Sequence, residues 1–277
     1  RMEDLYSDLQ SWLQVKDSDF PKDSKSKVDK TKVFGKTYMG EGRYVGMAAK
    51  YMLMVTDKGS TYFDYLKNFT GRQTLFGQRW HFLNEGSMYY GVGADMYNGA
   101  LRHDTSLHSH LVFNITINFI DGFRHYTYDL PVWIREGLGH WFQRQLSPKH
   151  NDFDQDESSP FRPLSKWRWK PYIRQLLKGK KWSRFSKASH WRHFGDINFN
   201  DHVMIWGRID FLMSFGKPKF REFMFAIKGR WDHKLQKADA DDMVGAVRDA
   251  LRNTYGLSPI NFDKKFREWA IKNYPLR

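Results

Sequence analysis

Glu136 and His140 are the pair of residues whose types and spacing most directly suggest chemistry. They lie within the apolar, aromatic run "LPVWIREGLGHWF", residues 130–142. Residues four apart in a helix project from the same face. A carboxylate and an imidazole placed together can ligate a metal ion or transfer protons. The alternative is a surface pair, which stabilises a helix by only about 0.2–0.5 kcal/mol.

A second polar set lies on a predicted helix that begins near residue 103 and includes "HSHLVFNITINFID". At about 100° per residue, His110, Asn114 and Asn118 share one face of that helix. His108 points away from them, so the two histidines of "HSH" do not serve one site. The polar face either meets solvent or lines a cleft. In a cleft, Asn114 and Asn118 would be candidate ligand-binding residues.

The elements that must position these residues change character near residue 95. Before this point the spacing predicts a mixture of helix and strand, with a hairpin in "QRWHFLNEGSMYY". After it the spacing is helical. Asp129 and Pro131 predict the start of a helix that ends near Leu146. Further helices are predicted over residues 201–215, 217–229, 240–256 and 261–275.

The fold class that these patterns predict is α+β and mainly helical. We expect a small N-terminal mixed α/β subdomain over residues 1–95 and a helical domain over residues 96–277. A region at about residues 147–200 has the composition of an insertion in that domain. Its acidic start, "DFDQDE" at residues 152–157, is predicted to be a solvated loop, because it lacks the glycine of a calcium-binding loop.

A basic, aromatic segment follows within the same region. Residues 162–192 hold eleven Lys or Arg and no Asp or Glu, interleaved with Trp, Tyr and Phe. Cations can neutralise phosphates or uronates, and aromatic faces can stack on bases or sugars. The alternative is a helical cover over a cleft, with its aromatic residues buried and its charges solvated. The candidate binding residues are Trp167, Arg168 and Trp169.

The bulk composition limits the classes of partner and of site. The 277 residues include no cysteine, which excludes disulfides and cysteine-based zinc sites, and the net charge of +14 favours anionic partners. No apolar run reaches the ~18 residues of a membrane span. The chain begins with Arg1 rather than Met. This start is compatible with removal of a signal peptide, in which case we expect a location outside the cytoplasm.

The stretch "DLPVWIREGLGHWF" resembles the second motif of the gluzincin-type metallopeptidases, in the peptidase-MA-like group. There an "LPxWlxEGlA" helix supplies a glutamate as the third zinc ligand. "NDHVMIWGRIDFLMSFGKPKFREFM" and "ALRNTYGLSPINFDKKFREWAIKNYP" resemble later helices of the same group. The resemblance covers roughly residues 100–277. It implies a gluzincin-like (zincin) helical core, with a cleft between that core and the N-terminal subdomain.

The chain departs from the family at the preceding helix, where family members carry HExxH. In that motif two histidines bind zinc and the glutamate activates water. The best register here is "HLVFN", residues 110–114. His110 takes the first histidine position, Leu111 replaces the general base and Asn114 replaces the second histidine. A neutral amide is a poor zinc ligand and a leucine accepts no proton. A shifted register again places a leucine at the base position.

Three functional interpretations follow from the resemblance and this departure. The first is a catalytically silent or divergent member that keeps the cleft and binds a polymeric ligand, a peptide or a glycan, with no required cofactor. The second is an active metal-dependent hydrolase with an unconventional ligand set, in which His110, Glu136 and His140 hold zinc and Glu136 or another carboxylate is the base. The third is a polyanion-binding module that uses residues 162–192.

His202 is the second candidate catalytic residue, after Glu136. It precedes a later helix at a place where such enzymes hold a tyrosine or histidine that stabilises the transition state. The resemblance alone implies this role. The alternative for His202 is helix capping or a position on the surface.

Overall fold

The computed structural model describes residues 1–19, 45, 51–74, 77–82, 87–95, 101–124, 130–153, 167–179, 182–232, 237–238 and 241–276. These residues form a mainly helical α+β fold with one small mixed sheet. The helices are α1 (Met2–Leu13), α2 (Gly59–Thr70), α3 (Asp104–Asp121), α4 (Val132–Leu146), α5 (Trp169–Gly179), α6 (Phe185–Ala188), α7 (Phe199–Met213), α8 (Lys217–Ile227), α9 (Met243–Tyr255) and α10 (Pro259–Asn273). The strands are β1 (Met52–Thr56), β2 (Gln78–Phe82), β3 (Ser87–Gly93), β4 (Trp231–Asp232) and β5 (Lys237–Ala238).

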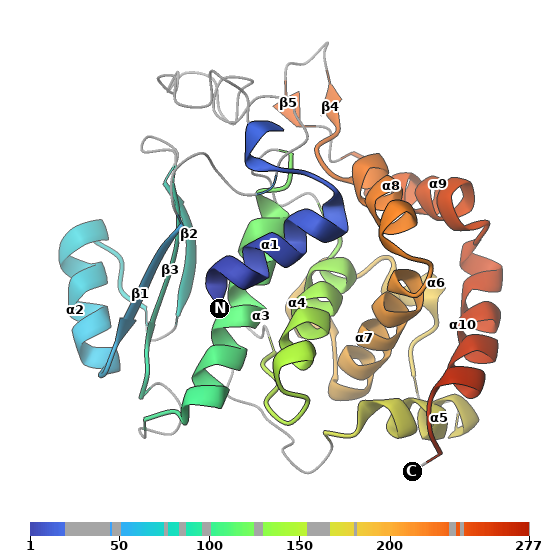
Figure 1. The fold of residues 1–277 in the computed structure, drawn as a ribbon, viewed down its shortest axis with the longest axis horizontal. Coiled ribbons are helices and arrows are strands. Elements are labelled where there is room, and N and C mark those ends of the chain that lie inside the picture. Colours follow the sequence, from blue (N-terminus) through green and yellow to red (C-terminus); the bar gives the residue numbers. More distant parts are fainter. Residues whose placement is uncertain are drawn as a thin grey trace.

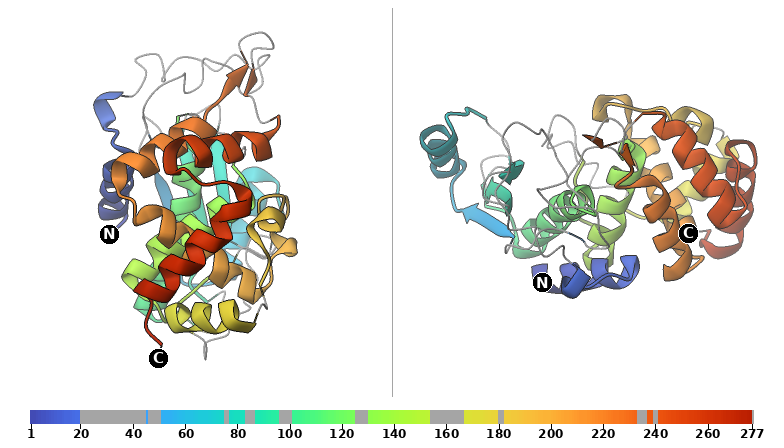
Figure 2. Two further views of the ribbon diagram at one scale, coloured as in Figure 1. Left: turned by 90° about the vertical axis from the view of Figure 1, so that its right-hand side faces the viewer. Right: turned by 90° about the horizontal axis from the view of Figure 1, so that it is seen from above.

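The elements are stacked in an order that follows the chain only in part. Figure 1 shows α2, the sheet, α3, α4, α7 and α10 one after another across the molecule, and the view from above in Figure 2 has the same sequence. Contacts join α3 to α4, α4 to α7 and α7 to α10. Helix α1 packs against α3 and α8. Helix α4 therefore lies in the middle of the molecule.

The sheet has the order β1-β3-β2. Strands β2 and β3 pair antiparallel, which confirms the predicted hairpin pairing, and β1 runs parallel to β3. Helix α2 covers one face of the sheet and α3 the other. Tyr62 and Leu66 of α2 pack with Tyr89 of β3 in a small separate core. The sheet thus supplies the surface on which α3 rests.

The predicted helix starting at Asp129 and Pro131 is α4, which begins at Val132 with Pro131 as its N-cap residue. Asp129 lies outside the described residues. Eleven of the fifteen residues of α4 are buried, so this helix is buried on all sides rather than amphipathic. A buried ion pair fixes it to α3, since Arg135 Nη2 donates to Asp121 Oδ2 at 2.8 Å. Burial raises the pKa of Asp121 despite this partner.

Two glycines allow the neighbours of α4 to approach closely. A Cβ atom on Gly137 would lie 2.5 Å from Ile209 Cγ1 of α7, and one on Gly139 would lie 2.9 Å from the ring of Phe113 in α3. Real Cβ atoms do not tolerate the first distance, so a side chain at residue 137 would push the two helices apart. The "EGLGH" sequence thereby sets the spacing of α4 from both partners.

The basic, aromatic segment contains the amphipathic helix α5. Trp169, Ile173, Leu176 and Leu177 are its buried residues, while Arg168 just before it, Lys170 and Lys178 are exposed. This division matches a helical cover with solvated charges, one of the two alternatives for the segment. Residues 154–166 and 180–181 lie outside the described part. No helix among the described residues is both long enough and apolar enough to cross a membrane.

Candidate functional site

Glu136 and His140 of α4 face α7, where they meet His202. The Nε2 atom of His140 lies 3.1 Å from Nδ1 of His202. Glu136 Oε2 lies 3.4 Å from the same Nδ1 atom and 3.8 Å from His140 Nε2. Glu136 and His140 are 0% exposed and His202 is 1% exposed. The surface-pair alternative for Glu136 and His140 is therefore wrong.

The local sequence explains why the three side chains meet. Glu136 and His140 are one helical turn apart, and Gly137 lets α7 approach. His202 lies in the first turn of α7. Asn198 caps that helix by accepting a hydrogen bond from the backbone N–H of Asp201. The capping or surface alternative for His202 is consequently wrong.

Aromatic rings enclose the imidazole of His140. Its centroid lies 5.0 Å from that of Phe113, 5.2 Å from that of Phe153 and 5.1 Å from that of Trp169. Burial, followed by the proximity of His202 and Arg144, holds the pKa of His140 well below its usual value. The ring is therefore neutral near pH 7 and offers a nitrogen lone pair to a proton donor or a metal ion.

His110 belongs to a different buried group. Its Nε2 atom lies 2.6 Å from the hydroxyl of Tyr90, and its Nδ1 atom lies 3.1 Å from Oδ1 of Asp152. Gln143 donates to Asp152 Oδ2 at 2.8 Å and accepts from the Asp152 backbone N–H at 3.1 Å. Arg102 Nη1 lies 3.7 Å from Asp152 Oδ1. This polar group ties α3 to β3 and to the segment after α4.

The residues that the structure gathers therefore differ from the set His110, Glu136 and His140. Among the described residues, the ligand atoms of Glu136, His140 and His202 lie within 4.8 Å of one another, and His110 is not in that group. His110 contacts Tyr90 and Asp152, and Leu111 and Asn114 beside it are not effective zinc ligands, so residues 110–114 do not fit a zinc ion.

The polar face of α3 packs on the sheet. Asn114 accepts a hydrogen bond from Arg79 Nη1 at 2.8 Å and donates to the His110 carbonyl at 3.0 Å. Asn118 donates to the Tyr51 hydroxyl at 2.8 Å. Both asparagines are buried, so the solvent alternative for this face is wrong. Their amides instead satisfy polar groups between α3 and the sheet.

The three candidate binding residues after the acidic loop have different environments. Trp169 is only 1% exposed and forms part of the wall around His140, so it presents no free face to a ligand. Trp167 is half-buried, and the exposed guanidinium of Arg168 lies 5.1 Å from its ring centroid. Arg168 thus remains available to an anionic partner.

Two corrections concern the start of the predicted acidic loop. Asp152 and Phe153 are 8% and 5% exposed, so neither is solvated. Asp152 is instead the acceptor in the buried group around His110, and residues 154–157 lie outside the described part.

Nothing in the periodicity of the sequence points to Asp152, Tyr90 or Arg79. Gln143 had a signal, because it follows His140 by three residues on the same helical stripe.

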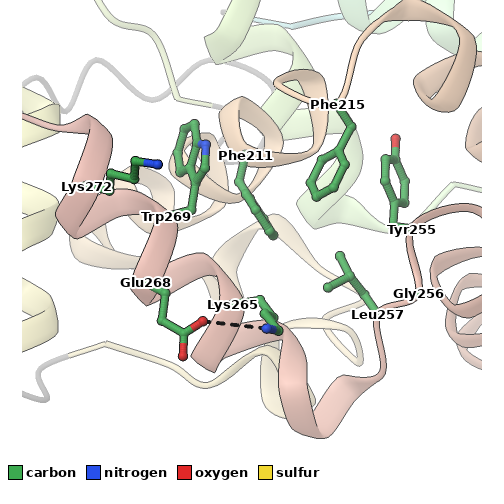
Figure 3. Close-up of a pocket in the computed structure, with 9 residues that line it drawn as sticks. All are labelled: Phe211, Phe215, Tyr255, Gly256, Leu257, Lys265, Glu268, Trp269 and Lys272. Atoms are coloured by element: carbon green, nitrogen blue, oxygen red, sulfur yellow. Dashed lines mark ion pairs between the residues drawn. The ribbon is translucent and has the colours of Figure 1, made fainter.

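A surface pocket lies away from these groups. It has a volume of about 420 Å³ and is lined mainly by residues from the end of α7, the α9–α10 connection and α10. Figure 3 shows Phe211, Phe215 and Trp269 around it, with the Lys265–Glu268 ion pair of 3.7 Å at its rim. None of the site residues predicted from the sequence lines this pocket.

Comparison with protein families, curated proteins and solved structures gives no match to this chain in any of the three. A carboxylate and two imidazoles can share protons or ligate a metal ion. At exposures of 1% or less, the three side chains do not reach a dissolved substrate.

Proposed function

We propose that this protein is a catalytically silent relative of the gluzincin-type metallopeptidases, which binds a peptide or glycan polymer without cleaving it. The observation that carries this proposal is the set of contacts made by three residues of α3. His110 contacts Tyr90 and Asp152, Leu111 is 4% exposed within the core, and Asn114 accepts from Arg79. The positions at which the resembled family ligates zinc and activates water are thus occupied by structural contacts.

The missing general base accounts for the expected loss of activity. A positioned base typically contributes about 10²–10⁴-fold to a hydrolytic rate. Leu111 accepts no proton. Glu136 is the obvious substitute, but its carboxylate lies fully buried beside His140 and His202. A base in that position has no path to a water molecule that attacks a polymer.

Hydrolysis of a peptide library by the full chain in the presence of zinc tests this proposal. Mass spectrometry should detect no cleavage above that in a buffer blank. Cleavage that is lost in Glu136→Gln but kept in Glu222→Gln, a matched change at an exposed glutamate of α8, would overturn the proposal. That result would instead favour an active hydrolase with an unconventional ligand set.

A second candidate function, polyanion binding, is favoured by the exposed cations of α5 and α6 and of the residues beside them. Arg168, Lys170 and Lys178 are exposed there, and Arg184 and Lys187 extend the exposed charge to α6. The sequence contains no Asp or Glu between residues 162 and 192. Exposed cations attract phosphate, sulfate or uronate groups. The polymer that this protein binds would then be an anionic one.

A further inference from the structure

We propose that Glu136, His140 and His202 form a binding site for one four-coordinate transition-metal ion, zinc foremost, that links α4 to α7. This site does not depend on whether the protein cleaves or merely binds a polymer. It differs from the ligand set predicted from the sequence, because His202 takes the place of His110. The proposal rests on the distances between the three ligand atoms, their chemistry and their burial.

The distances between the three ligand atoms are close to those expected around a zinc ion. Zinc bonds of about 2.0–2.2 Å in a tetrahedron place two ligand atoms about 3.3–3.6 Å apart. The three distances here are 3.1, 3.4 and 3.8 Å. A triangle with these sides has a circumscribed circle with a radius of about 2.0 Å. An ion slightly above the plane of the three atoms therefore reaches all of them at bonding distance.

Hydrogen bonds between the three side chains explain these contacts less completely than a bound metal ion does. An N–H···N bond explains the 3.1 Å between the two imidazoles. The 3.4 and 3.8 Å contacts of Glu136 Oε2 are long for hydrogen bonds, which favour about 2.7–3.2 Å for a nitrogen donor. A shared cation explains all three contacts together.

The donor set selects the class of ion. Two imidazoles and one carboxylate suit zinc and its transition-metal neighbours, whereas magnesium and calcium prefer oxygen ligands alone. Metal ligation requires neutral histidines, and full burial of the His140 ring disfavours its charged form. A divalent ion also offsets the charge of the fully buried Glu136 carboxylate.

Burial assigns the ion a structural role. Three protein ligands leave one coordination position, which the second carboxylate oxygen of Glu136 or a water molecule can fill. Because the three side chains are at most 1% exposed, a polymer does not reach that position. The ion instead cross-links α4 and α7, and it stabilises the folded chain because the unfolded chain binds it weakly.

A zinc titration of the full chain against a competing chelator tests the site. Wild type should bind one zinc ion per chain. Removing a residue that only supports a ligand costs roughly 10–100-fold in metal affinity, so His202→Gln should cost about 100-fold or more. His110→Gln is the matched control at a second buried histidine and should leave the zinc affinity unchanged. Thermal unfolding in EDTA verifies that both variants fold.

Two results would overturn the site. The first is a wild-type chain that binds no stoichiometric zinc. The second is a loss of affinity in His110→Gln as large as that in His202→Gln. If either variant does not fold, anomalous X-ray scattering from crystals of the zinc-loaded wild type decides between the outcomes. A zinc ion bonded to His140 and His202 is expected, and a zinc ion bonded to His110 would contradict the proposal. Peptide hydrolysis is measured separately. A chain that binds no zinc would therefore not contradict the proposal that the protein is a silent peptidase relative.

Discussion

At the scale of single residues, the spacing of the sequence predicts which side of a helix a side chain lies on, but not which distant residues it contacts. The separation of Glu136 and His140 correctly places both on one face of a helix. Their third neighbour, His202, lies 62 residues beyond His140 in the chain. No local rule joins residues so far apart, because their contact depends on how α4 packs on α7. The same reason explains why the bond between His110 and Asp152, 42 residues apart, was not predicted.

A buried tyrosine provides a residue-scale prediction that is independent of the metal. The hydroxyl of Tyr255 is buried without a hydrogen-bond partner among the described residues, and burial raises its pKa. Removing an unsatisfied buried group is nearly neutral or stabilising. Tyr255→Phe should therefore leave the free energy of unfolding at pH 7 unchanged or higher. Tyr274→Phe should cost about 1.5–3 kcal/mol, because it removes the 2.9 Å hydrogen bond to Asp210.

The raised pKa of Tyr255 also fixes the sign of an alkaline effect. Above about pH 10 the unfolded chain loses the tyrosine proton while the folded chain keeps it. The unfolded state then binds fewer protons, so the stability that is complete below pH 10 falls as pH rises. Urea unfolding between about pH 8 and pH 11 measures this effect, which should begin near about pH 10. The free energy of unfolding should fall less steeply with pH in Tyr255→Phe than in wild type. Equal slopes would contradict the burial of this hydroxyl.

At the scale of elements, helix spacing and end signals predict most of the helical half. Gly256 ends α9 in the left-handed conformation, and Ser258 caps α10 by accepting from the Asn261 backbone N–H. The environment of each face could not be predicted. The polar stripe of α3 has the spacing of a solvent-facing stripe, yet it packs on the sheet, because Arg79 and Tyr51 supply polar partners there.

The close approach of α4 and α7 yields an element-scale prediction. In Gly137→Ala the new Cβ would lie 2.5 Å from Ile209 Cγ1 and 3.3 Å from the Ile205 carbonyl oxygen. The helices must separate, which should cost about 1–3 kcal/mol in the free energy of unfolding. Separation also moves His202 away from Glu136 and His140, so zinc affinity should fall.

Gly195→Ala is the matched control for this variant, since no atom lies within 4 Å of a Cβ there. Urea unfolding and the zinc titration measure the two effects. If Gly137→Ala proves as stable as the control and binds zinc equally well, the spacing of α4 and α7 does not position the site.

At the scale of the whole molecule, composition and periodicity predict the α+β class and the strong positive charge, but not how the elements are arranged. The main hydrophobic core contains Val92 of β3 as well as Leu138 of α4 and Ile205 of α7. It thus extends across the predicted boundary at residue 95. Such long-range packing has no local signal in the sequence, because each helix is compatible with several neighbours.

The salt dependence of polyanion binding gives a whole-molecule prediction for the exposed cations of α5. With duplex DNA as a polyanion probe, the slope of log affinity against log salt reports the number of neutralised phosphates. The triple variant of Arg168, Lys170 and Lys178 to Gln should reduce that slope by up to about 3. The control replaces Lys58, Lys67 and Arg72 around α2, at the other end of the molecule. Equal effects of both variants would mean that net charge alone drives binding.

We propose that Glu136, His140 and His202 converge on one ion. Anomalous X-ray scattering at the zinc edge, from crystals of the zinc-loaded full chain, locates that ion. We expect one strong peak about 2.0–2.2 Å from His140 Nε2, His202 Nδ1 and a carboxylate oxygen of Glu136. A peak between His110 and Asp152 instead, or no peak between α4 and α7, would contradict it.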